Sequence, residues 1–135
     1  MELKSLKIGK YEIKYPIIQG GMGLGISWNR LAGNVSLNGG LGVISSVGTG
    51  YYEHRAHITK ELNSKPYDSV NFYSRNGFKA IIDNARKICG DKPLAANIMC
   101  ASNDYARIVK DACEHGINII ISGAGLPTNL PELTK

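Results

Sequence analysis

The chain has 135 residues and a net charge of +5; 43% of the residues are hydrophobic and 20% are charged. This composition is ordinary for one globular domain, which we expect to span residues 1–135. The cations are dispersed and no apolar stretch approaches the roughly 20 residues of a membrane span, so we expect a cytoplasmic protein with neither a nucleic-acid nor a membrane partner.

The first elements along the chain are a hairpin and a glycine-rich loop. Leu6–Ile8 and Tyr11–Ile13 flank Gly9-Lys10, which predicts a β-hairpin that closes one end of the sheet. The apolar run Pro16–Ile18 then leads into Gln19-Gly20-Gly21-Met22-Gly23-Leu24-Gly25, which indicates a buried strand ending in a loop whose backbone approaches a flat or anionic ligand. These glycines match neither the dinucleotide fingerprint nor the phosphate loop, so a tight turn without a ligand is the alternative that spacing leaves open.

A helix and a second strand follow this loop. Ser27 is the expected N-cap of a helix in which Leu31 and Val35 lie one turn apart, and Gly39-Gly40 ends it. The apolar run Leu41–Ser46 is the next expected strand.

Residues 51–73 are polar, rich in tyrosine and mildly basic, and we expect them to form an inserted surface loop with a short helix at about 53–62. Tyrosines interleaved with cations are also compatible with single-stranded nucleic acid, but an insertion is favoured because loops accept insertions readily. His54 and His57 have no third ligand nearby in the sequence, so we expect surface residues and no metal site.

The rest of the chain repeats the alternation of helix and strand. The expected elements are a helix capped by Ser74 and ended by Gly90, a strand over Pro93–Met99, a helix from Ser102 or Asn103 to Gly116, a strand over Ile117–Ser122, and a helix that begins between Thr128 and Pro131. Strands that each precede a helix predict an α/β fold with a parallel sheet. All the expected strands finish in glycine, serine or asparagine, at the end of the sheet where ligands collect.

The cysteines indicate packing rather than redox or metal chemistry. Cys89, Cys100 and Cys113 are odd in number and form no Cys-x-x-Cys pair. We therefore expect small buried hydrophobes.

Four blocks of this sequence resemble, in order and spacing, the first half of the nitronate monooxygenase family, formerly called 2-nitropropane dioxygenases. The blocks are Pro16–Gly23, Gly39–Ile44, Asn97–Met99 and Ser122–Pro127. The family also contains FMN-dependent enoyl-acyl-carrier-protein reductases. The resemblance implies a TIM (β/α)₈ barrel that holds FMN at the carboxyl ends of its strands, of which this chain has four strand-helix units, a partial barrel.

The same resemblance implies the site residues. The backbone of Gly21, Met22 and Gly23 would run along the isoalloxazine ring, the Asn97 side chain would address the ring or the substrate, and Ser122 and Gly123 would complete that wall. The alternatives are that Asn97 caps the turn into the next helix and that Met22 only fills the core.

No catalytic residue is assigned in this chain. The family's catalytic histidine belongs to a Gly-Gly-His block of the second half, and its FMN phosphate is held after the seventh and eighth strands. Neither block occurs in this sequence, and we expect His115 at the opposite end of the sheet from the pocket.

The leading hypothesis is an FMN-dependent oxidoreductase that oxidises alkyl nitronates with dioxygen to a carbonyl compound and nitrite. Enoyl-thioester reduction is the alternative within the family. A third hypothesis is a non-catalytic half-barrel, which would dimerise into an eight-stranded arrangement or aggregate because its sheet edges are unpaired.

Overall fold

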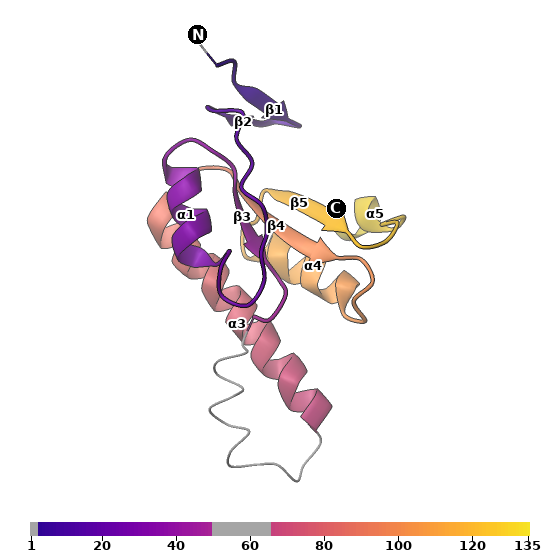
Figure 1. Ribbon diagram of the computed structural model, residues 1–135. Coiled ribbons are helices and arrows are strands. Elements are labelled where there is room, and N and C mark those ends of the chain that lie inside the picture. Colours follow the sequence, from indigo (N-terminus) through magenta and orange to yellow (C-terminus); the bar gives the residue numbers. More distant parts are fainter. Residues whose placement is uncertain (1–2, 50–65) are drawn as a thin grey trace.

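The computed structural model of the protein describes residues 3–49 and 66–135 (Figure 1). In chain order the elements are β1 (Leu6–Ile8), β2 (Tyr11–Ile13), α1 (Asn29–Leu37), β3 (Gly42–Ser45), α3 (Pro66–Cys89), β4 (Leu94–Met99), α4 (Tyr105–Glu114), β5 (Ile119–Gly123) and α5 (Leu130–Leu133). The expected α/β class and the alternation of strand and helix after the hairpin are confirmed. The short helix expected at about 53–62 lies outside the described residues.

The central sheet is parallel and follows the order of the chain. β3 pairs with β4 and β4 pairs with β5, so strands that follow one another in the sequence are neighbours in the sheet. A parallel bridge between Ile18 and Leu41 joins the segment before the glycine loop to the other edge of β3. This sequential order is that of a singly wound sheet and differs from the reversed order of a dinucleotide-binding fold.

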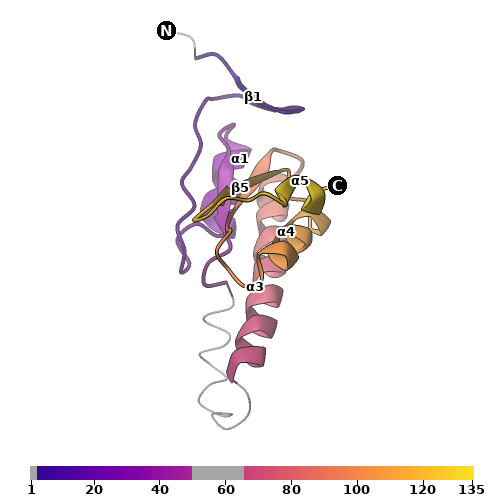
Figure 2. The ribbon, with the colours of Figure 1, turned by 90° about the vertical axis from the view of Figure 1, so that its right-hand side faces the viewer.

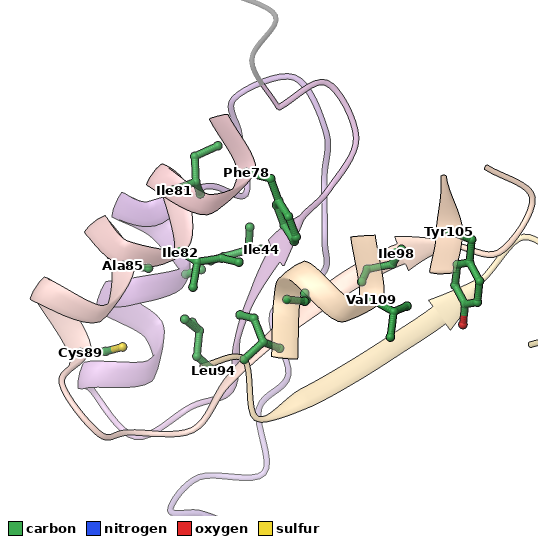
Figure 3. Close-up of a cluster of buried hydrophobic side chains, with 14 residues drawn as sticks. Ile44, Phe78, Ile81, Ile82, Ala85, Cys89, Leu94, Ile98, Tyr105 and Val109 are labelled. Atoms are coloured by element: carbon green, nitrogen blue, oxygen red, sulfur yellow. The ribbon is translucent and has the colours of Figure 1, made fainter. Parts of the chain in front are cut away.

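The helices α1, α3 and α4 pack on one face of the sheet (Figures 1 and 2). Because side chains alternate along a strand, Leu94, Ala96 and Ile98 of β4 point to these helices, while Ala95 faces the opposite side. The core between the sheet and the helices consists of Ala32, Ile44, Phe78, Ile81, Ile82, Ala85, Cys89, Leu94, Ala96, Ile98, Tyr105, Val109, Ala112 and Ile117 (Figure 3).

Helix α1 lies very close to β3. A Cβ atom added to Gly42 would come 1.9 Å from the carbonyl oxygen of Ala32, so only glycine fits between this helix and this strand. The hydroxyl group of Ser36 joins the same contact, since it accepts from the Gly42 N–H (3.0 Å) and donates to the carbonyl of Pro93 (2.7 Å).

The predicted hairpin is confirmed. β1 and β2 pair antiparallel, and Gly9 adopts φ +57° in the turn between them. The side chain of Ile13 is buried against Leu41, Val43 and Ala95, on the face of the sheet that the helices leave open. The hairpin therefore covers the amino end of this face, as the sequence led us to expect.

The first expected strand is only partly formed, and the expectation that it is buried is wrong. Ile17 and Ile18 are 56% and 48% exposed, and the pairing consists of the single bridge to Leu41. The ladder stops because the side-chain oxygen of Gln19 accepts the Val43 N–H (3.0 Å), where a regular strand would offer its backbone carbonyl.

Three expected helix caps are also wrong. α3 begins at Pro66 rather than at Ser74, and proline suits a first helical turn because its missing N–H would have no partner there. The backbone of residues 66–73 is thus helical, and that 51–73 is an insertion stays a prediction. The N-cap residues of α1 and α4 are Trp28 and Asp104, and neither makes a side-chain capping bond.

The three cysteines pack against the core, but the expectation that they are buried holds for Cys89 alone. Cys89 is buried in the core, Cys100 and Cys113 lie partly buried against it, and all three are free thiols. Among the described helices, none has the length and apolar character to cross a membrane.

Candidate functional site

The glycine loop is closed by one buried serine. The Ser27 side chain is fully buried, and its hydroxyl donates to the carbonyl of Gly20 (2.9 Å) and accepts from the Met22 N–H (2.8 Å). The Ser27 backbone N–H donates to the carbonyl of Met22 (2.9 Å), and its own carbonyl accepts from the Ser45 N–H (2.9 Å). Residues 20–27 therefore form a closed ring fixed to the carboxyl end of β3.

Gln19 connects this ring to the sheet. While its oxygen accepts the Val43 N–H, its amide nitrogen donates to the Ser27 hydroxyl (2.8 Å) and to the carbonyl of Gly20. The Gln19 carboxamide thus spans the gap between β3 and the loop, and its position is set from both sides.

Gly21 and Asn97 lie in direct contact. A Cβ atom built on Gly21 would stand 2.6 Å from the Asn97 Cβ and 3.2 Å from its amide nitrogen. Since real Cβ atoms do not approach so closely, the loop passes over Asn97 only because position 21 has no side chain. The structure therefore brings together the first and third sequence blocks, 76 positions apart, at the carboxyl end of the sheet.

Gly23 and its neighbour rest on the turn that follows β3. A Cβ atom on Gly23 would lie 3.2 Å from the Val47 side chain and from its carbonyl, and the Leu24 N–H donates to that carbonyl (3.3 Å). Leu24 adopts φ +52°, and its side chain fills the space beside Gly48. Met22, between the two close-packed glycines, is 50% exposed, so the alternative that it fills the core is wrong.

Asn97 points to the open face of the sheet. In the parallel register it pairs with Ser45 on β3 and with Ile121 on β5. Among the described residues its carboxamide has no hydrogen-bond partner, so the alternative that it caps the turn into α4 is not supported. Its donor and its acceptor are available to a ligand.

The side chain of Ser122 does not point to the pocket wall that it was expected to complete. Its hydroxyl lies 2.8 Å from the Tyr105 hydroxyl of α4, on the helix face of the sheet, so its side chain is no part of the open face. Gly123 ends β5 and pairs with Met99, which is 41% exposed, and the N–H of Cys100 donates to its carbonyl (2.8 Å). Gly123 thus lies at the same end of the sheet as Asn97.

Two backbone amides of the glycine loop have no partner in the part of the chain that the structure describes. Among the described residues, the N–H groups of Gly21 and Gly23 make no hydrogen bond, while the intervening Met22 N–H is held by Ser27. The surrounding stretches 16–28, 41–49, 94–103 and 119–129 contain no acidic, basic or histidine side chain. Within these four stretches the hydrogen-bond donors carry no charge, and the charged side chains Asp104, Arg107 and Asp111 lie beside Ser46 and Thr49.

The one histidine among the described residues, His115, lies away from this site. No group of three or more histidine, cysteine or acidic side chains is arranged for a metal within residues 3–49 and 66–135. His115 is the C-cap of α4 and its Nδ1 lies 3.2 Å from Asp83 of α3, at the amino end of the sheet. The expectation for His115 is confirmed.

Sequence reasoning did not foresee the contacts of the Gln19 side chain and took Ser27 for a helix cap. The available signal was a carboxamide directly after an apolar run and a serine inside an otherwise uncharged loop. What that signal could not reveal is that the two side chains meet, since the loop must first fold back over eight residues.

Comparison with known proteins gives one family. Residues 4–135 match the nitronate monooxygenase family, which is nearly the whole chain. A search of curated proteins gave no significant match.

Proposed function

The chain belongs to the nitronate monooxygenase family, and from this premise we propose that it forms the flavin-contacting part of an FMN-dependent oxidoreductase. The reaction is oxidation of an alkyl nitronate with dioxygen to a carbonyl compound and nitrite. The observation that carries the proposal is the contact of Gly21 with Asn97, because it gathers bare main chain and a free carboxamide at the carboxyl end of a parallel sheet.

The residues present fit a flavin ring. The free N–H groups of Gly21 and Gly23 suit the ring's carbonyl and nitrogen acceptors, and close approach of a flat molecule needs main chain without side chains. Met22 and Met99 are half-exposed apolar side chains at the same end of the sheet, where they can contact the ring and exclude water. Bound FMN would supply the electron acceptor for the substrate and the reaction with dioxygen.

The residues of this chain bind and orient the flavin and the substrate, and they do not transfer protons. Asn97 has both a donor and an acceptor, so it can hold the ring edge or the substrate's nitro group. Gly123 leaves open space where a side chain would stand, which keeps the end of β5 accessible. Because the surrounding stretches contain no acidic, basic or histidine side chain, we assign no general base to them.

The proposed fold is the first half of a TIM barrel. Sequential strand order with the helices α1, α3 and α4 on one face is the arrangement of a barrel wall. In that arrangement Val43, Ala95 and Ile119 would point to the barrel interior, and the hairpin would close its amino end.

Titration of the full chain with FMN tests the proposal. We expect saturable quenching of flavin fluorescence and a flavin absorbance band near roughly 450 nm that stays with the protein during gel filtration. Release of nitrite from an alkyl nitronate by the loaded protein would support the reaction. A folded chain that leaves FMN fluorescence unchanged at high concentration would overturn the assignment.

A further inference from the structure

We propose that Gln19 and Ser27 are positioning residues that clamp the glycine loop, so that the Gly21 and Gly23 amides remain available to the flavin. We call this pair of side chains the loop clamp. The inference rests on the proposed function and goes beyond it, because it assigns a role to two residues that would not themselves touch the ring.

The bonding of Ser27 is complete. A serine hydroxyl has one proton and two lone pairs, and here the proton goes to the Gly20 carbonyl while the lone pairs accept from Met22 and Gln19. A fully buried hydroxyl with all three bonds made is costly to replace, because its loss leaves buried polar groups without partners. The loop conformation is therefore tied to this one side chain.

The clamp selects which amides face a ligand. Its bond to the Met22 N–H removes that donor from the surface, while the amides on either side have no partner among the described residues. Without the clamp, the loop could turn the Met22 amide outward and the glycine amides inward. Preorganised donors bind a ligand more tightly because no ordering remains to be done on binding.

Ser36 provides a matched control. It is also a buried serine whose hydroxyl both donates to a carbonyl and accepts an N–H, but its partners are Pro93 and Gly42 at the amino end of the sheet. Ser36→Ala should therefore lower stability like Ser27→Ala without reaching the glycine loop.

The first test uses the full chain without flavin. Amide hydrogen exchange followed by NMR should show the Met22 amide exchanging at least about tenfold faster in Ser27→Ala than in the wild type, with the Gly42 amide unchanged. In Ser36→Ala the Gly42 amide should exchange faster than in the wild type, and the Met22 amide should exchange at the wild-type rate. Equal protection of Met22 in the wild type and in Ser27→Ala would overturn the clamp.

The second test measures FMN affinity by fluorescence quenching. Ser27→Ala and Gln19→Met should each weaken binding by about tenfold or more, whereas Ser36→Ala should stay within about twofold of the wild type. The double variant should bind within about twofold of the weaker single variant, because the two side chains act as one unit. If Ser27→Ala fails to fold, Gln19→Met alone tests the effect of the loop clamp on FMN affinity.

The outcomes separate the two proposals. If the wild type binds FMN and the clamp variants bind like Ser36→Ala, the clamp is wrong and the proposed function stands. If the folded wild type binds no FMN, the proposed function is wrong and the clamp loses its flavin role with it.

Discussion

Two adjacent glycines give a sharp test of the site at the scale of single residues. A side chain at Gly20 would meet nothing within 4 Å, while one at Gly21 would collide with the Asn97 Cβ at 2.6 Å. We expect Gly21→Ala to weaken FMN binding by about tenfold or more, because the loop must lift from Asn97. Gly20→Ala should bind FMN within about twofold of the wild type.

The readout for this pair is the dissociation constant from flavin fluorescence, with circular dichroism to verify folding. Equal affinities of Gly20→Ala and Gly21→Ala would contradict the contact between Gly21 and Asn97 as the seat of the ligand.

The thiol of Cys113 should be a slow nucleophile. Burial, and secondarily the negative charge of Glu114, raise the pKa of Cys113 above the ordinary value of a cysteine. A raised pKa means a smaller thiolate fraction at neutral pH, so alkylation should be slow there and accelerate only as the pH rises through that higher pKa.

Mass spectrometry of iodoacetamide-treated protein measures this rate. The pH midpoint of alkylation is the quantity to compare with a small-molecule thiol, because restricted access lowers the rate at every pH without moving the midpoint. A midpoint at or below that of the small-molecule thiol would contradict the prediction.

Single residues also show where sequence reasoning stopped. Gly21 and Asn97 were assigned to one site through the resemblance to the family, and the structure shows that they lie in contact. The orientation of Ser122 could not, since a strand alternates faces and its first residue is uncertain by one or two positions. Only the pairing of Asn97 with Ile121 decides it, because it puts Ile121 on the open face and Ser122 on the helix face.

At the scale of elements, Arg86 joins the amino ends of two strands. Its guanidinium donates to the carbonyls of Gly90 (2.9 Å), Lys92 (2.8 Å) and Gly116, and to the Asn118 side-chain oxygen (2.6 Å), which itself accepts from the Leu94 N–H (2.9 Å). The end of α3 is thereby tied to the loops that precede β4 and β5. One side chain thus fixes three elements.

We expect Arg86→Met to lower the free energy of unfolding by about 1–3 kcal/mol, since several charge-assisted bonds are lost although water replaces part of them. Lys87→Met is the matched control, because among the described residues Lys87 bonds only Asn84 of the same helix (3.0 Å), and its loss should cost less than about 0.5 kcal/mol. Urea unfolding gives both values, and similar losses for the two variants would contradict the role of Arg86.

Element types were predictable from the sequence, whereas several boundaries were not. The apolar periodicity of α3 and α4 and the runs of β3 and β4 carry their own signal. The start of α3 at Pro66 was missed because residues 66–73, which precede the expected cap at Ser74, lack that apolar periodicity. A strand was expected at Ile17–Ile18, but its shortness was not, because the pairing ends through a side-chain bond of Gln19, which no periodicity encodes.

On the scale of the whole molecule, both sheet edges are open to association. Among the described elements β5 pairs only with β4, and at the other edge Ile17 and Ile18 are about half exposed. Unpaired edges and apolar surface favour pairing with another chain, so we expect the mass of the particle to increase with protein concentration.

Light scattering coupled to size-exclusion chromatography measures that mass. Ile18→Lys should shift the protein toward the monomer, because a charge on the edge opposes strand pairing. Leu37→Lys is the control, since Leu37 is equally exposed at 48% but lies at the end of α1. A wild type that stays monomeric at high concentration would contradict the expectation.

The position of the hairpin has a consequence for how this protein can change. The amino end of the sheet is secured by the side chains of the hairpin, the bonds of Arg86 and the contact of Ser36. At the opposite end lie the glycine loop and the Asn97 carboxamide, which has no partner among the described residues. Apart from the loop clamp, the residues that secure the fold differ from those that the proposed function places beside the substrate. A library randomised at Val47, Met99 and Leu126, which are 40%, 41% and 81% exposed, should therefore yield many folded variants with altered substrate preference. The same number of random changes around Ile13 should yield mostly unfolded chains.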